Sequence, residues 1–87
     1  MSQVWLVGGA QADGTMQFNG DSDSTLVKGL IALLMVLVNG KAAKDILATD
    51  IAGLFKSLGL ESHITVNRRN GFFSMVERIR LLCTQAT

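Results

Sequence analysis

The residues of this chain that could carry out chemistry are few and widely spaced. Asp21 and Asp23 flank one serine, and the sequence holds a single histidine, His63, and a single cysteine, Cys83. Two carboxylates so close together could bind a metal ion or form a catalytic acid pair. A cysteine thiolate could attack or accept sulfur. One cysteine alone excludes an internal disulfide and a cysteine-only metal cluster.

Each of these residues also has a structural interpretation. Asp21 and Asp23 precede an apolar segment, where acids favour a turn and the N-terminus of a helix. A lone loop histidine is more often a hydrogen-bonded structural residue than a ligand. Cys83 falls on the apolar face of the predicted last helix, where burial raises the pKa of a thiol and makes it inert. Arg80 is close in sequence and keeps a reactive Cys83 open as the alternative.

Length and composition limit the class of protein. The chain has 87 residues, enough for one domain over residues 1–87, and a net charge of +1. That charge gives no bias towards nucleic acid or membranes, and neither is an expected partner. Residues 26–38 are apolar apart from Lys28, but as a helix they would span about 20 Å, short of a bilayer core. No signal-peptide pattern precedes them, so we expect a cytoplasmic protein, or an organellar one if a targeting segment has been lost.

Turn signals and hydrophobic spacing predict an α+β domain. Asp13-Gly14, Asn39-Gly40 and Gly59 mark the expected chain reversals. The spacing places a β-hairpin at about residues 3–19. It places helices at about residues 24–38, 42–49, 51–58 and 69–84, with a loop at 61–67. The architecture expected is a small antiparallel sheet packed against a cluster of helices.

The same patterns predict the core. Trp5, Met16 and Phe18 are expected inside the hairpin's apolar face. The helix at 24–38 is apolar nearly all round, so we expect it to be central and buried, with Gly29 permitting the close approach of another backbone. The later helices should bury two stripes of side chains. These are Ile51, Leu54, Phe55 and Leu58, and then Phe72, Val76, Ile79 and Cys83.

Four stretches, in this order and spacing, resemble the SufE-like sulfur acceptors of iron–sulfur cluster assembly. A fifth, in the last helix, also matches. Val66 and Asn67 depart from the family by replacing its usual Pro-Ser pair, which should loosen that loop modestly. The stretches are Ser2-Gln-Val-Trp-Leu6, Gly20-Asp-Ser-Asp23 leading into Leu26-Val-Lys-Gly-Leu-Ile31, Leu58-Gly-Leu60, His63-Ile-Thr-Val-Asn-Arg-Arg-Asn-Gly71 and Met75-Val-Glu-Arg-Ile79.

The resemblance implies a SufE/IscU-like fold and a role as a sulfur-transfer accessory protein rather than an enzyme, without a cofactor. Its expected partners are a SufS-like cysteine desulfurase and an Fe–S scaffold. Asp23 matches an acid that lies close to the family's cysteine loop, and Arg68 matches an arginine near the active cysteine that contacts the desulfurase. Together with His63 they are the expected partner-binding residues. For Arg68 the alternative interpretation, weighed equally, is a solvated charge at a helix start.

The resemblance also implies a missing part. In the family, the segment matched by residues 2–6 follows directly after the sulfur-carrying cysteine, so the acceptor is expected immediately before Met1. The first third of the family domain, two helices, a strand and the cysteine loop, would then be absent. An unpaired sheet edge and partial self-association are expected as a result. The alternative function is a thiol-less interaction module that binds or regulates a desulfurase. A membrane-surface protein, which would partition into lipid, is the remote third.

Overall fold

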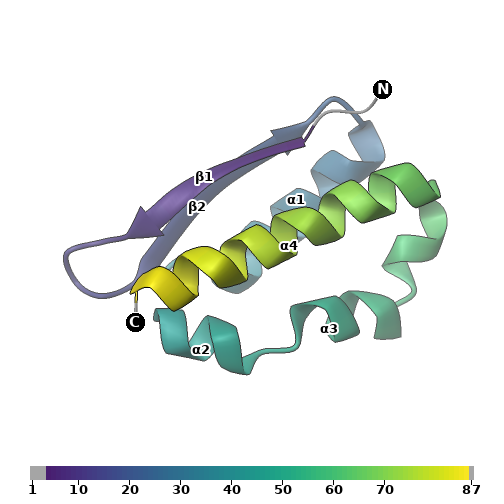
Figure 1. Cartoon of the computed structure of the whole chain (residues 1–87). Coiled ribbons are helices and arrows are strands. Elements are labelled where there is room, and N and C mark those ends of the chain that lie inside the picture. The colour runs from purple at the N-terminus through teal and green to yellow at the C-terminus, as the bar shows by residue number, and fades with distance from the viewer. Residues whose placement is uncertain (1–3, 87) are drawn as a thin grey trace.

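Two antiparallel strands lie across two long helices, and shorter helical segments cover the opposite side in this computed structural model (Figure 1). The structure describes residues 4–86, without the side chain of Glu61. Ser2 and Gln3 of the first matched stretch lie outside the described residues. The predicted α+β class is confirmed. The elements are β1 (Val4–Ala10), β2 (Met16–Ser22), α1 (Thr25–Val38), α2 (Ala43–Ala48), α3 (Ile51–Ser57), the 3₁₀ helix η1 (Leu60–His63) and α4 (Val66–Ala86).

The hairpin register decides which strand residues face the helices. Val4 pairs with Ser22 and Ala10 with Met16, so the strands extend past the expected end near residue 19. Met16 and Phe18 are buried, as predicted. The prediction for Trp5 was wrong, because this register places it opposite Asp21 on the outer face, with 49% of the side chain exposed. Side chains alternate between the two faces of a strand, and composition alone does not say which set faces the core.

The predicted Asp-Gly turn closes the hairpin. Gly14 adopts a φ of 87°, a left-handed conformation that glycine reaches without steric cost. The amide of Gln11 donates to the carbonyl of Thr15 at 2.8 Å, and Thr15 donates its own amide to the carboxylate of Asp13 at 3.0 Å. These bonds fix the length of the loop and therefore the strand register above it.

Helix α1 is buried on one side only, which corrects the prediction of a helix buried all round. Its inner residues recur at helical spacing, but Leu26 and Val36 are 56% and 73% exposed. A Cβ at Gly29 would meet nothing within 4 Å, so no backbone approaches it closely. The apolar residues of α1 therefore exceed what its neighbours cover. Its buried residues are Val27, Leu30, Ile31, Leu34 and Val38.

Helix α4 carries the rest of the core on its predicted face. Phe72 packs edge-on against Phe55 of α3 with ring centroids 4.9 Å apart, and Cys83 is fully buried near the C-terminal end of α4. The stripe expected on α3 is narrower than predicted, because Leu54 and Leu58 are exposed. No helix among residues 4–86 combines the length and apolar character needed to cross a bilayer.

Helix α4 begins at Val66 rather than near residue 69, and η1 occupies part of the expected loop. Thr65 is the cause of the early start. Its hydroxyl accepts from the amide of Arg68 at 3.4 Å, and its carbonyl accepts from the amide of Arg69 at 2.9 Å. Threonine is a favoured N-cap residue, so the helix starts directly after it.

Candidate functional site

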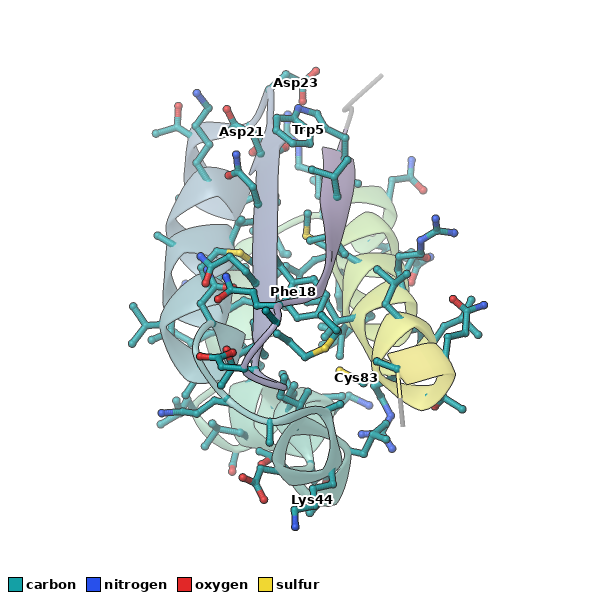
Figure 2. All side chains as sticks on the ribbon, turned by 90° about the vertical axis from the view of Figure 1, so that its left-hand side faces the viewer. Trp5, Phe18, Asp21, Asp23, Lys44 and Cys83 are labelled. Carbon is teal, nitrogen blue, oxygen red and sulfur yellow. The ribbon has the colours of Figure 1, made fainter. Side chains whose placement is uncertain are left out.

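The acidic turn between β2 and α1 is held by its serines. Asp21 accepts from the amide of Ser22 at 2.8 Å, and the hydroxyl of Ser22 accepts from the amide of Ser24 at 3.1 Å. Both serines are buried, whereas Asp23 between them is exposed. The turn therefore presents the exposed Asp23 side chain at the end of the hairpin, the same end at which Figure 2 shows Trp5.

This turn does not cap α1 as the sequence suggested. Ser24 occupies the N-cap position, but its side chain makes no capping hydrogen bond, and the first turn of α1 contains no acid. The carboxylate of Asp21 instead lies 3.8 Å from the ammonium group of Lys28, with both side chains about half exposed. Exposed pairs of this kind contribute little to stability. The two acids thus lie in the turn ahead of α1 and outside the first turn of the helix.

Arg68 lies in the first turn of α4, partly buried, with its amide bonded to the Thr65 cap. A cation there opposes the positive end of the helix dipole. One turn later, the Val4 side chain lies 3.5 Å from where a Cβ on Gly71 would stand. The start of β1 therefore packs on α4 at Gly71, which follows Arg68 by three residues.

His63 ends η1 and is exposed. It lines an apolar groove of about 340 Å³ with residues of α1 and of the segment before α4. This groove connects His63 to the exposed apolar face of α1. The other residues lining it are Leu26, Gly29, Leu30, Leu33, Leu60 and Ile64.

The segments that carry the three predicted partner-binding residues meet at one end of the molecule. The start of β1, the β2–α1 turn with Asp23 and the first turn of α4 with Arg68 lie at that end, and the chain reaches it through η1 with His63 (Figure 1). The sequence did not predict the groove beside Trp5. It has a volume of about 330 Å³ and is lined by Val4, Trp5, Leu6, Gly71, Ser74, Met75 and Arg78. The feature of the sequence that could have indicated this groove is the pair of small residues Gly71 and Ser74, three and six positions after Arg68.

Cys83 lies away from this end, towards the opposite end of the sheet (Figure 2). Its side chain has no exposed surface, and burial raises the pKa of its thiol, although the positive charge of Arg80 opposes that shift. Arg80 itself points at the α2–α3 connection, where its guanidinium donates to the carbonyls of Leu47 and Thr49 at 3.4 Å. A thiol in this environment is a poor nucleophile.

The remaining chemistry that the acids suggested finds no geometric support. Among the described side chains, no three or more histidine, cysteine, aspartate or glutamate residues gather in a way that could hold a metal ion. Asp21 and Asp23 therefore lack the further ligands that a cation site needs. What the arrangement offers is an exposed acid, a partly buried arginine and a histidine at one end of the fold.

Comparison with known proteins gives one consistent result. Residues 1–83 match the model of the SufE family, described as an Fe–S metabolism associated domain. The chain is 43% identical over 82 residues to an uncharacterized SufE-like protein of Rhizobium etli. That alignment covers 91% of this chain and 55% of the relative, so the chain spans about half the length of the curated relative it matches.

Proposed function

Because the chain belongs to the SufE family of Fe–S metabolism associated domains, we propose that it is a desulfurase-binding, sulfur-acceptor domain of iron–sulfur cluster assembly. In this function a cysteine desulfurase supplies persulfide sulfur, and a scaffold for cluster assembly receives it. Arg68, Asp23 and His63 are the residues that we assign to contact with the desulfurase.

One observation carries this proposal. The start of β1 pairs with the acidic turn through Val4 and Ser22, and it packs on α4 at Gly71, one turn after Arg68. In the family, the segment matched by residues 2–6 follows the sulfur-carrying cysteine. A cysteine ahead of that segment would be delivered to the end of the fold that holds Asp23 and Arg68.

The chemistry of transfer explains why charges at this end matter. An acceptor thiolate attacks the outer sulfur of the desulfurase persulfide, the sulfur–sulfur bond breaks, and the desulfurase cysteine leaves as a thiolate. A nearby cation lowers the pKa of the attacking thiol and raises the thiolate fraction. Arg68 is suited to that task, and Asp23 is suited to hold the loop in a resting position.

A second function is favoured by the burial of Cys83. It is the one cysteine of the sequence, and it has no exposed surface. A chain whose only thiol is buried could bind a desulfurase without accepting sulfur, as a regulatory or tethering module. This alternative uses the same contact residues and differs only in the fate of the sulfur.

Binding of the chain to a purified cysteine desulfurase tests the shared part of both functions. We expect Arg68→Glu to weaken the complex at least roughly tenfold, because it places like charges where opposite ones should meet. Lys44→Glu is the matched control, since it makes the same charge change on an exposed side chain of α2, far from Asp23 (Figure 2). Equal affinities of the two variants would refute the assignment of Arg68.

Mass spectrometry after incubation with desulfurase and cysteine tests whether Cys83 is the sulfur acceptor. A reductant-sensitive sulfur adduct on Cys83 would show that this thiol accepts sulfur despite its burial. Binding without an adduct would exclude Cys83 as the acceptor and is expected both of the interaction module and of an acceptor domain whose cysteine precedes residue 2. The test is informative only for folded protein, which circular dichroism establishes beforehand.

A further inference from the structure

Three of the four asparagines in this chain are followed directly by glycine. The pairs are Asn19-Gly20, Asn39-Gly40 and Asn70-Gly71. Such a pair can lose ammonia spontaneously, because glycine has no side chain that keeps its backbone nitrogen away from the asparagine carboxamide. The nitrogen attacks the side-chain carbon, a cyclic succinimide forms, and water then opens the ring. Asparagine counts among the thermolabile residues. The structure decides which of the three pairs can react.

Two of the pairs are held inside regular secondary structure. Asn70 and Gly71 lie within α4, and Asn19 and Gly20 lie within β2. Closing the succinimide ring requires the asparagine backbone to rotate out of both the helical and the extended conformation. A reaction at Asn70 therefore requires α4 to unwind near its start, and a reaction at Asn19 requires β2 to separate from β1.

The ladder register shows how Asn19 is held. In an antiparallel ladder, opposite residues either bond each other or both point outward. Phe18 bonds outward to Asn39, so its ladder partner Gly8 also points outward, and so do the residues two positions away on each strand. Asn19 is the next residue of β2 and therefore bonds its partner Val7 within the ladder.

The third pair lies in the connection after α1, outside any helix or strand, and both of its reacting groups bond to β2. The carboxamide oxygen of Asn39 accepts from the amide of Phe18 at 2.7 Å, and its nitrogen donates to the carbonyl of Phe18 at 3.1 Å. The amide of Gly40 donates to the carbonyl of Met16 at 2.9 Å. Separation of this connection from β2 therefore frees the two groups together, while α1 and the β1–β2 ladder stay in place.

The fold requires this reactive pair. Gly40 has a φ of 77°, a left-handed conformation that strains a residue with a side chain. A carboxamide at position 39 supplies both the donor and the acceptor that Phe18 needs. Asn39 is partly buried and lines a cavity of about 560 Å³ beside the hairpin, which gives water access to its side chain.

We propose that Asn39 is a site of spontaneous deamidation that reacts when the connection after α1 separates from the β2 edge, and that its product keeps this edge open. The nitrogen of Gly40 bonds to the side-chain carbon of Asn39, and the bond from that carbon to the carboxamide nitrogen breaks. Ammonia leaves with the proton of the Gly40 amide. Water then cleaves one of the two ring bonds to nitrogen and leaves aspartate or isoaspartate at position 39. Water is the only co-reactant, and no group is oxidised or reduced.

Neither product can restore the bonds to β2. A carboxylate accepts hydrogen bonds but does not donate them. Aspartate at position 39 would therefore set an anion against the carbonyl of Phe18, which now lies 3.1 Å from the carboxamide nitrogen. Isoaspartate adds an atom to the backbone between positions 39 and 40, which displaces the amide of Gly40 from Met16. The reaction thus converts a transient opening of the edge into a lasting one.

Ageing of the folded chain, followed by tryptic digestion and mass spectrometry, tests the site. Cleavage after lysine and arginine places the three pairs on separate peptides, residues 1–28, 29–41 and 70–78. The control is the same chain aged in concentrated guanidinium chloride, where no fold holds the pairs. We expect Asn39 to react first of the three in the folded chain, at a rate at least roughly tenfold below its rate in denaturant, because only the open fraction reacts. Equal rates at Asn39 in the two samples would overturn the proposal, and so would faster reaction of Asn19 or Asn70 in the folded chain.

Asn39→Asp tests the lasting opening, because it introduces one product directly. The amides of Met16 and Phe18 should exchange hydrogen at least about tenfold faster than in the unchanged chain. Asn19→Asp is the matched control, since it makes the same change at an exposed position of β2 and should leave both amides protected. The same measurement on aged chain, separated from unreacted chain by ion exchange, does not depend on the folding of the variant. Full protection of Met16 and Phe18 in the deamidated protein would refute the lasting opening.

Discussion

The two edges of the hairpin expose the same backbone chemistry, but among residues 4–86 other segments bond to only one of them. On β2, the side-chain amide of Asn39 accepts from the Phe18 amide at 2.7 Å and donates to the Phe18 carbonyl at 3.1 Å. Next to it, Met16 donates to the carbonyl of Lys41 at 2.8 Å and accepts from the amide of Gly40 at 2.9 Å. On β1, the outward groups of Leu6 and Gly8 have no counterpart of this kind among residues 4–86.

The difference shows which part of the chain determines whether a sheet edge is paired. Asn39 follows α1 and lies 21 residues from Phe18 in sequence. Its carboxamide carries a donor and an acceptor, so one side chain replaces a residue of a neighbouring strand. Gly40, with a φ of 77°, turns the chain back so that its amide reaches Met16. The β2 edge is therefore closed by the connection after α1, and the strand's own sequence contributes little to that closure.

The largest effect should come from the residue that links the two edges. Phe18 bonds Asn39 through its backbone, and its ring lies against the backbone of Gly8 on β1, where a Cβ would come within 2.5 Å of it. Phe18→Ala should lower the free energy of unfolding by about 3–5 kcal/mol, the usual cost of removing a buried phenylalanine. Urea denaturation measures this loss.

Val7→Ala provides the control for Phe18→Ala on the opposite face of the sheet. Val7 is 60% exposed, so its truncation should change stability by less than about 0.5 kcal/mol. Equal losses in the free energy of unfolding for Phe18→Ala and Val7→Ala would show that the inner face of the hairpin does not carry the core.

An intermediate loss of stability should follow from removing the side chain that pairs the β2 edge. Asn39→Ala leaves the amide and carbonyl of Phe18 without their partners, which should cost about 1–3 kcal/mol in thermal or urea unfolding. It also leaves the β2 edge unpaired, so the variant should associate more strongly than the unchanged chain in sedimentation profiles. Asn19→Ala removes the same group from an exposed position of β2 and should do neither. Unchanged stability in Asn39→Ala would show that water replaces the side chain without loss.

Local features of the fold could be predicted from the sequence because they depend on neighbouring residues. Gly14, Gly40 and Gly59 all adopt positive φ, as the turn signals indicated. Asp50 caps α3 by accepting from the amide of Gly53 at 3.1 Å, and aspartate is a favoured N-cap residue. Such features are determined by the preferences of a few adjacent residues, so a single sequence is enough to predict them.

Features that depend on distant residues could not be predicted. The exposure of Trp5 follows from the strand register, and the exposed side of α1 follows from which neighbours pack on it. The bonds from Asn39 to Phe18 join segments whose meeting no local pattern encodes. For the candidate site, the sequence indicated Asp23, Arg68 and His63 through a resemblance. The groove between β1 and α4 could not be predicted, because it depends on the packing of Val4 against Gly71.

The smallest effect concerns the loop that joins the two edges. The hydroxyl of Thr15 donates to the carboxylate of Asp13 at 2.6 Å and its amide donates at 3.0 Å, and these bonds hold the pKa of Asp13 below its ordinary value of 3.8. A lowered pKa means that the unfolded chain binds the proton more readily. The stabilisation is therefore complete above pH 3.8 and is lost as the pH falls through the lower folded pKa.

Asp13→Asn isolates that charge, because the asparagine keeps an oxygen that can accept both bonds. Unfolding measured at pH 7 should show a small loss in the variant, and the loss should shrink towards zero as the pH falls below 3.8. Thr15→Ala removes the hydroxyl donor and should give part of the same pH dependence. A loss independent of pH would mean that the loop is held by geometry alone. The β1 and β2 edges would then be joined by a turn that needs no ionised side chain.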